Sequence, residues 1–270
     1  MSNQYSRRPL ILDLDFTLLH LEYIPDSIEV PGRTRSAWIA PRTVALLDEL
    51  QEKYDIVLAT ARSWDGTKWV SDGLAERGVV VSGVVIEDGA LYGSPDNLQP
   101  MDAAFEVENA RALIESQKRS EWPDYEWQFD FKACLVARCQ NVEAAAELHQ
   151  IFEGQVDWSQ SDQKLRFFRD GRKIYVISEI ADKWNALQKL LGEKLENAAG
   201  VGDGANDVCW LPKVAKPCTF ANAKLVLVEQ IRARNGFVTP KDHHEGIAHI
   251  LSYLSTGILF SNGIRSKKAG

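Results

Sequence analysis

The sequence predicts an α/β protein, in which a parallel sheet carries helices on both faces and a smaller α+β unit is inserted. Short apolar runs alternate with segments of helical periodicity over residues 9–86. Two segments with strand alternation, 125–138 and 164–178, follow a change of pattern near residue 88, and the first pattern resumes at about residue 180. Strands that are apolar throughout are typical of parallel sheets covered on both faces.

Apolar periodicity separates strands from helices in the first part of the chain. Continuous apolar runs predict buried strands, and apolar residues at helical spacing predict helices. The expected strands are residues 9–15, 55–60 and 79–86. The expected helices are residues 41–53, which begin with a proline, and residues 64–76.

The middle of the chain has the pattern of an antiparallel sheet with helices on one face. Residues 125–138 alternate apolar and polar side chains, with a bend near Lys132 that splits them into two strands. Asp170-Gly171 between two alternating runs predicts a hairpin over residues 164–178. Helices are expected at residues 103–119 and 142–152.

Strand–helix alternation returns in the last part of the chain. Helices are expected at 182–194 and 244–254, and a third starts within 205–214. A short strand is expected at 198–202, and an edge element at 219–220. We therefore predict a core of residues 1–88 and 180–270 with an inserted domain of residues 89–179.

Composition limits the class of protein. The 270 residues include 31 Lys and Arg against 38 Asp and Glu, a formal charge of −7. This acidic balance argues against a nucleic-acid-binding protein, and no apolar run reaches the roughly 18–20 residues that span a bilayer. The four cysteines have neither zinc-site nor disulfide-framework spacing. We expect a cytoplasmic monomer or homodimer that binds neither nucleic acid nor membrane.

Two aspartates close the first predicted strand. Asp13 and Asp15 are two residues apart, so on an extended chain their side chains point to the same side. Two carboxylates in one small site repel each other unless a cation lies there or a bend separates them. Ligands of open parallel sheets bind beyond the carboxyl ends of the strands. This pair alone leaves open the simpler interpretation of two solvated loop acids.

Later segments add groups of the same kind. Thr60 ends the second apolar strand, and Arg62 follows it. Asp203 and Asp207 lie in a glycine-rich turn, where backbone amides can approach an anion or a metal shell closely. Lys183 opens a predicted helix. Because Mg²⁺ prefers carboxylate oxygens and is often completed by substrate phosphate, these residues predict a site for Mg²⁺ and phosphate.

On these motifs the chain resembles the haloacid dehalogenase-like hydrolases. The motifs are Asp13-x-Asp15-x-Thr17, Thr60, Lys183 and Gly202-Asp203-Gly204-Ala205-Asn206-Asp207. The resemblance spans nearly the whole chain and implies a Rossmann-like core. The inserted domain resembles the cap of a sugar-phosphatase branch, which includes sucrose-phosphate, trehalose-phosphate and mannosylphosphoglycerate phosphatases and also phosphomannomutases.

The resemblance implies an Mg²⁺-dependent phosphatase that acts on a small phosphorylated metabolite, above all a sugar phosphate. Asp13 would form an aspartyl-phosphate, and Asp15, with a raised pKa, would serve as acid and then base. Thr60 and Lys183 would hold the phosphoryl oxygens as further catalytic groups. Substrate contacts are expected from Thr60, Ala61, Arg62, Asp88, Lys183 and Asn206, with a pairing to a surface acid as the equal alternative for Arg62. Mg²⁺ ligands are expected from Asp13, the Asp15 carbonyl, Asp203 and Asp207, the last of which either binds the metal or orients a ligand.

The chain departs from the family pattern near the site. Phe16, Ala61 and Trp184 stand where relatives usually have glycine. We favour harmless backbone tolerance at each, and the alternative is a narrowed or aromatic-lined pocket. Asp88 replaces a frequent asparagine, and its carboxylate would repel phosphate unless it binds a substrate hydroxyl.

Several alternatives remain open at the level of sequence. A phosphomutase of the phosphomannomutase type would use the same motifs, and a non-catalytic sugar-phosphate-binding protein could share the fold. The complete set of Asp13, Asp15, Lys183, Asp203 and Asp207 argues against the latter. Basic residues of the inserted domain either contact an anion or form the wet face of its sheet: Lys132, Arg138, Arg166, Arg169 and Lys173. Its tryptophans, Trp122, Trp127 and Trp158, are expected mainly in its core.

Overall fold

The computed structural model describes residues 7–33, 35–161 and 164–256. An eight-stranded sheet has the strand order β14-β13-β12-β1-β4-β5-β6-β7. Six strands run parallel: β1 (Arg8–Leu12), β4 (Tyr54–Ala59), β5 (Val81–Ile86), β12 (Ala199–Val201), β13 (Lys216–Phe220) and β14 (Phe237–Thr239). Two further strands extend the sheet: β6 (Leu91–Ser94) pairs antiparallel with β5, and β7 (Asn97–Pro100) pairs antiparallel with β6.

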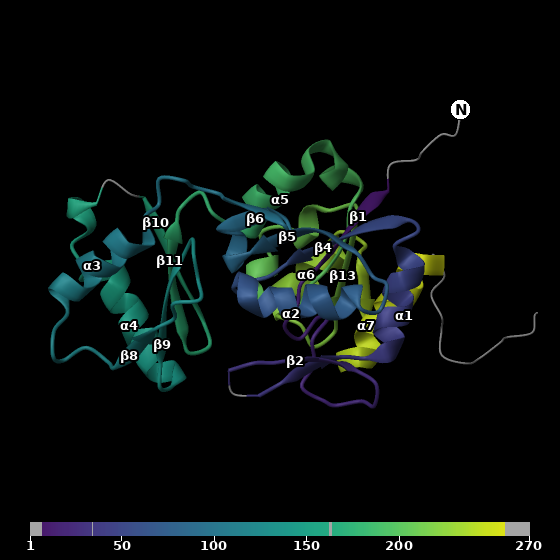
Figure 1. Cartoon of the computed structure of the whole chain (residues 1–270), viewed down its shortest axis with the longest axis horizontal. Coiled ribbons are helices and arrows are strands. Elements are labelled where there is room, and N and C mark those ends of the chain that lie inside the picture. The colour runs from purple at the N-terminus through teal and green to yellow at the C-terminus, as the bar shows by residue number, and fades with distance from the viewer. Residues whose placement is uncertain (1–6, 34, 162–163, 257–270) are drawn as a thin grey trace, which may run out of the picture.

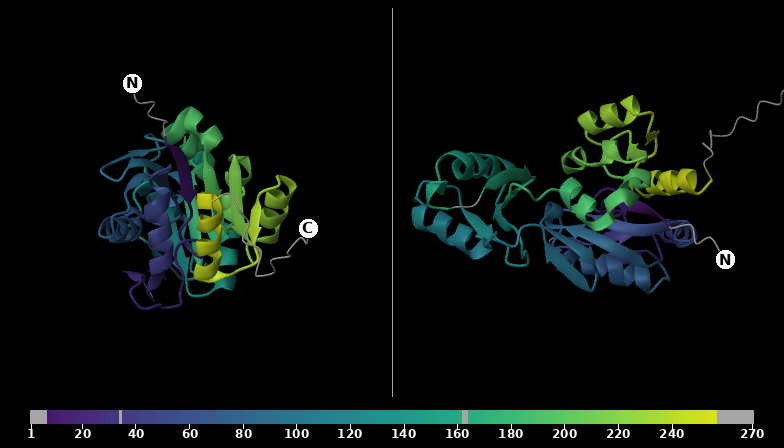
Figure 2. Two further views of the ribbon diagram at one scale, coloured as in Figure 1. Left: turned by 90° about the vertical axis from the view of Figure 1, so that its right-hand side faces the viewer. Right: turned by 90° about the horizontal axis from the view of Figure 1, so that it is seen from above.

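Helices cover both faces of this sheet (Figures 1 and 2). The helices α1 (Pro41–Leu50), α2 (Trp64–Ala75) and α7 (His243–Thr256) pack on the face that Leu10 and Leu12 present. The helices α5 (Lys183–Leu191) and α6 (Leu225–Ala233) pack on the other face, which Ile11 presents. Alternate residues of one buried strand thus enter two separate cores, which is why these strands are apolar throughout.

A second, four-stranded antiparallel sheet lies beside the first (Figure 1). Its order is β10-β11-β9-β8, from β8 (Tyr125–Trp127), β9 (Leu135–Cys139), β10 (Leu165–Asp170) and β11 (Lys173–Ser178). The helices α3 (Val107–Gln117) and α4 (Val142–Gly154) pack on one face and close an apolar core with the three expected tryptophans. We call this sheet with α3 and α4 the cap.

Polar contacts among the described residues tie the cap to the larger unit around Asp88, Glu87 and Asp130. Arg166 on β10 donates to the carboxylate of Asp88 at 2.9 Å. The buried carboxylate of Glu87 accepts the backbone amides of Lys132 at 2.9 Å and Ala133 at 2.8 Å. Asp130 accepts a hydrogen bond from Ser63 Oγ at 2.7 Å and also pairs with Arg33. The face of the cap sheet opposite its helices therefore meets the core.

The predicted fold class is confirmed, since a parallel sheet with helices on both faces stands beside a separate antiparallel sheet. The split near Lys132 and the hairpin at Asp170-Gly171 are also present. The division at residues 88/89 and 179/180 stays a prediction, and β6 and β7 lie in the large sheet. Residues 1–6 and 257–270 of the predicted core lie outside the described residues.

Other expectations need correction. Residues 205–214 form two short 3₁₀ turns rather than the start of an α-helix, because Pro212 lacks the N–H that an α-helix needs there. Thr219 and Phe220 belong to β13, an inner strand, and β14 is the edge. The sequence reasoning missed β6, β7, β14, α6 and the hairpin of β2 (Ile28–Val30) and β3 (Ala37–Ile39).

Short 3₁₀ segments complete the described structure. They are Glu87–Gly89, Trp158–Gln160, Gly192–Asn197, Ala205–Asp207 and Leu211–Lys213. No helix among the described residues is long and apolar enough to cross a membrane.

Candidate active site

The carboxyl ends of three neighbouring strands gather the central groups of the site. Asp13 follows β1, Thr60 follows β4, and Asp203 lies two residues after β12. The amide of Asp13 donates to Val201 O at 3.0 Å, which ties the end of β1 to β12. Since β12, β1 and β4 are adjacent and parallel, their ends meet at one edge of the sheet.

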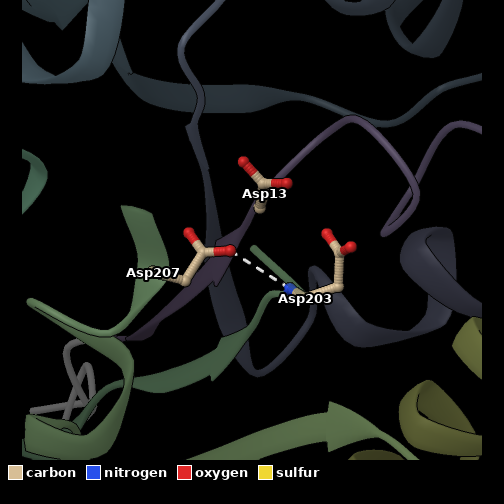
Figure 3. Close-up of side chains that lie close together, drawn as sticks. All are labelled: Asp13, Asp203 and Asp207. Carbon is tan, nitrogen blue, oxygen red and sulfur yellow. Dashed lines mark hydrogen bonds between the residues drawn. The ribbon is translucent and has the colours of Figure 1, made fainter. Parts of the chain in front are cut away.

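Three carboxylates meet at this edge (Figure 3). One oxygen each of Asp13, Asp203 and Asp207 lies within 4.8 Å of the others. Burial, with the carboxylates of Asp207 and Asp203, raises the pKa of Asp13 despite the opposing charge of Lys183. Burial and Asp207 raise the pKa of Asp203 to about 6. A divalent cation would relieve this repulsion, and an all-oxygen donor set fits Mg²⁺.

Lys183 supplies a buried positive charge to the same cluster. It is the first residue of α5 and has no exposed side-chain surface. Its Nζ donates to Asp13 Oδ1 and to Asp207 Oδ1, each at 2.8 Å. Burial disfavours the ammonium form, but the charges of Asp13 and Asp207 outweigh it and raise the pKa of Lys183. The lysine therefore stays charged and faces the site as a fixed cation.

The carboxylate of Asp207 is already saturated with hydrogen bonds. Oδ1 accepts from Lys183 Nζ and from Trp210 Nε1, both at 2.8 Å. Oδ2 accepts the amides of Asp203 at 3.1 Å and Gly204 at 2.9 Å. A Cβ at Gly202 would lie 2.6 Å from Asp207 Oδ2, so this close approach requires glycine. This environment favours an orienting role for Asp207, because a direct metal contact would displace one of these donors.

Asp15 lies apart from this cluster and pairs with Arg62. The carboxylate is half exposed, and it accepts from Arg62 Nε at 2.8 Å and Nη2 at 2.6 Å. Desolvation raises the pKa of Asp15, but the hydrogen bonds and the charge of Arg62 outweigh it, so the net shift is downward. The expectation of a raised pKa at Asp15 is therefore wrong for this arrangement.

The site opens into a cavity of about 660 Å³ between the cap and the core. Seven of the sequence-predicted residues line it: Asp13, Asp15, Thr60, Ala61, Asp88, Asp203 and Asn206. The other three are hydrogen-bonded to residues of this set. Arg62 donates to Asp15, Lys183 donates to Asp13, and Asp207 accepts the amide of Asp203. The structure thus brings together every side chain that the sequence marked for the site. Their individual roles stay predictions.

Asp88 is buried and paired. Its carboxylate accepts from Arg166 at 2.9 Å and from Asn206 Nδ2 at 3.2 Å. Burial raises its pKa, while Lys183 and Arg166 act against that shift. These partners offset the repulsion that we expected between Asp88 and a phosphate.

The three departures from glycine have different surroundings. Phe16 and Ala61 line the cavity. Trp184 is the second residue of α5 and is not among the lining residues; it packs against the core, with Lys213 Nζ 4.5 Å from its ring centroid. Phe16 therefore adds an aromatic ring to the cavity wall, and Ala61 adds a single methyl group.

The structure adds residues that sequence reasoning did not single out. Phe168 lines the cavity from β10, and Lys224 lines it from the segment before α6. Phe168 could have been found from the sequence, since it lies two residues after Arg166 and so faces the same side of the strand. No sequence pattern pointed to Lys224, because the helix that follows it, α6, was not predicted. Of the basic cap candidates, Arg166 and Arg169 line the cavity.

The architecture defines an α/β enzyme with carboxylates and a buried lysine at its strand ends, under a cap. The sequence profile of the haloacid dehalogenase-like hydrolases matches residues 75–251, more than half of the chain. The chain therefore belongs to this family and is a hydrolytic enzyme. No curated protein matches the sequence.

Solved structures share the fold at low sequence identity. The Thermoplasma acidophilum protein 0175 has a TM-score of 0.67 at 15% identity, over 92% of this chain and 98% of its own. A haloacid dehalogenase-like hydrolase from B. subtilis has a TM-score of 0.64 at 17% identity, covering 92% and 99%. The sucrose-phosphatase of Synechocystis sp. PCC6803, solved with sucrose and phosphate, has a TM-score of 0.60 at 14% identity, covering 92% and 98%.

Proposed function

We propose that this hydrolase is an Mg²⁺-dependent phosphatase that acts on a small sugar phosphate through an aspartyl-phosphate. The observation that carries the proposal is the position of Asp13 at the end of β1, where it lines the cavity and accepts a hydrogen bond from buried Lys183 at 2.8 Å. A carboxylate held beside a fixed cation in a water-poor site can attack phosphorus while the cation offsets the charge of the phosphoryl oxygens.

The first half-reaction transfers the phosphoryl group to the enzyme. An oxygen of Asp13 forms a bond to phosphorus, and the bond between phosphorus and the sugar oxygen breaks. The pairing with Arg62 keeps Asp15 ionised, so Asp15 must first leave Arg62, contact the substrate and take up a proton from solvent. It then gives this proton to the leaving oxygen. The incoming phosphoryl group is an alternative partner for the Arg62 guanidinium.

The second half-reaction regenerates the enzyme. A water oxygen attacks phosphorus, Asp15 accepts the proton of that water, and the bond between phosphorus and Asp13 breaks. Inorganic phosphate and a free Asp13 carboxylate result, so atoms and charges balance. Thr60 and Lys183 hold the phosphoryl oxygens through both steps.

Asp13, the Asp15 carbonyl and Asp203 would hold Mg²⁺, and the saturated Asp207 would orient this set. When bound, the metal neutralises charge on the phosphoryl oxygens and on the clustered carboxylates. Thr17 Oγ1 donates to Asp203 at 3.1 Å, which fixes the direction of this carboxylate.

A sugar phosphate is supported by the chemistry of the cavity wall. Asp88, Asn206 and Arg166 form one hydrogen-bonded group there, and such mixed donors and acceptors suit hydroxyls. The fold shared with the sucrose-phosphatase, which was solved with sucrose and phosphate, agrees with this class.

The test is phosphate release from a panel of sugar phosphates, with Mg²⁺ or with chelator. We expect Mg²⁺-dependent release by the wild type and its loss in Asp13→Asn. The control is Asp72→Asn, an exposed aspartate paired with Lys68 on α2, which should retain activity. Conversion of a sugar phosphate to its isomer without net release would make the protein a phosphomutase. Binding of sugar phosphates without any conversion would instead indicate a non-catalytic binding protein.

A further inference from the structure

Phe16 combines an unfavourable backbone conformation with an exposed ring. Its φ is 59°, in the left-handed region that residues with a Cβ rarely adopt, and the amide is held by Leu19 O at 3.0 Å. The side chain is 58% exposed and lines the cavity directly after Asp15. Because the ring gains little from burial, this strain is not explained by packing, and strain next to reacting groups points to a role with a ligand.

The cap contributes a second aromatic side chain to the same cavity. Phe168 stacks on Tyr175 with ring centroids 4.5 Å apart and an angle of 7° between the rings. The guanidinium carbon of Arg166 lies 4.7 Å from the Phe168 centroid. Since Arg166 is itself bound to Asp88, the position of this aromatic wall is fixed from both sides.

The cavity thus offers aromatic surface and hydroxyl-binding groups together. The C–H face of a sugar ring is apolar, and its rim carries hydroxyls. Phe16 and Phe168 suit the face, while Asp88, Asn206 and Arg166 suit the rim. A flat nucleobase would need partners for its ring nitrogens, and the paired carboxylate of Asp88 is better matched to hydroxyl donors.

We propose that Phe16 determines specificity for a closed sugar ring in the leaving group, by packing on the C–H face of the ring adjacent to the transferred phosphoryl group. This inference rests on the proposed phosphatase function and refines its substrate class. It explains why a phenylalanine occupies a position where glycine would relieve the backbone.

The experiment compares ring sugars with their open-chain counterparts. Hexose and pentose phosphates are each paired with the alditol phosphate that borohydride reduction yields, and nucleoside monophosphates complete the panel. The measured quantity is the ratio of kcat/KM for the ring substrate over kcat/KM for its alditol. We expect Phe16→Gly to lower this ratio at least about tenfold, with little change for the alditol.

Two controls separate recognition from folding. Phe129→Ala removes an exposed aromatic side chain of the cap that is not among the cavity-lining residues, and should keep the wild-type ratio. Phe16→Gly should not lower the thermal midpoint, because glycine adopts the left-handed conformation without strain. A merely structural phenylalanine would instead lower the midpoint and leave the ratio intact.

An unchanged ratio in Phe16→Gly overturns the inference, as does a wild-type preference for alditol phosphates or nucleoside monophosphates. If the wild type releases no phosphate from any substrate, the phosphatase proposal fails. Calorimetry then tests the role of Phe16 separately, by measuring how tightly Asp13→Asn binds each ring phosphate and its alditol phosphate, with and without Phe16→Gly. Tighter binding of the ring phosphate that Phe16→Gly abolishes supports the inference. The same ratio of ring to alditol affinity with and without Phe16→Gly refutes it.

Discussion

Lys183 is a fully buried cation whose two carboxylate partners come from different segments of the chain. Removing one member of a buried ion pair leaves a charge without compensation, which costs about 3–5 kcal/mol. We expect Lys183→Met to lower the free energy of unfolding by that amount in urea titrations with chelator. Lys189→Met, on the exposed side of the same helix, is the matched control and should change stability by less than about 0.5 kcal/mol. A Lys183→Met protein as stable as wild type would refute the prediction.

The pairing of Asp15 with Arg62 predicts a pH effect of defined sign. The folded-state pKa of Asp15 lies below its ordinary value of 3.8, so the pair stabilises the fold above pH 3.8. This contribution disappears as the pH falls through the lower folded-state value. Arg62→Gln should raise the pKa of Asp15, because the hydrogen bonds and the charge of Arg62 are the largest influences that oppose desolvation of the carboxylate.

Carboxyl NMR titration of the wild type and Arg62→Gln measures this shift directly. Arg77→Gln, which removes a guanidinium near Asp26 O, is the control and should leave the pKa of Asp15 in place. An equal Asp15 pKa in wild type and Arg62→Gln would show that Arg62 is not the cause.

At the residue scale, sequence spacing predicted the meeting of Asp13, Thr60 and Asp203, because ends of adjacent parallel strands converge. It did not predict that Asp15 faces Arg62, since the chain turns after β1 and Phe16 has a positive φ. The saturation of Asp207 was also beyond prediction, because it depends on Trp210, which belongs to a turn where a helix was expected.

At the scale of elements, the junction of β5 with α5 depends on Gly89. Its φ is 96°, and a Cβ there would lie 2.2 Å from the carbonyl of Asp182 and 2.7 Å from the amide of Lys183. We expect Gly89→Ala to destabilise the protein by about 3 kcal/mol or more, from overpacking and left-handed strain together. Thermal or urea unfolding measures the loss.

Gly154→Ala provides the matched control for this substitution. Gly154 is the last residue of α4, and nothing lies within 4 Å of a Cβ placed there. Alanine should therefore be neutral there or stabilise by up to about 1 kcal/mol. Equal effects of the two substitutions would mean that the contact of Gly89 with the start of α5 is unimportant.

Extended segments with clear apolar periodicity predicted most helices and central strands, whereas short elements were not predicted. β2, β3 and β14 have three residues each, too few for a strand pattern to stand out. β7 is polar and largely exposed, so no apolar alternation marks it. Its place is set by pairing with β6, which is a tertiary property.

At the scale of the whole molecule, the proposed metal should stabilise the fold by mass action. A ligand at 100 times its Kd that binds only the folded state adds about 2.7 kcal/mol. We expect Mg²⁺ to raise the thermal midpoint and chelator to reverse the rise. The rise should be lost in Asp203→Asn and kept in Asp72→Asn. No rise in the wild type, or an equal rise in Asp203→Asn, would contradict the assigned metal position.

The sequence-based division into two units did not predict the side-chain contacts between them. The inserted segment was recognised by its change of periodicity, but contacts between units depend on single side chains from distant parts of the chain. Glu87, Ser63 and Arg166 carry these contacts, and none of them disturbs a local pattern.

The contacts that Glu87 and Asp130 make between cap and core differ in their access to water. Glu87 has no exposed surface, so salt should have little effect on its hydrogen bonds to the cap amides. Asp130 and Arg33 are partly exposed, and ionic strength weakens such a pair far more than a buried one. Salt should therefore weaken the contact at Asp130 more than the contact at Glu87, and we expect the cap to open on the side of Asp130. Substrate entry measured by stopped flow should accelerate with salt in the wild type and much less in Asp130→Asn.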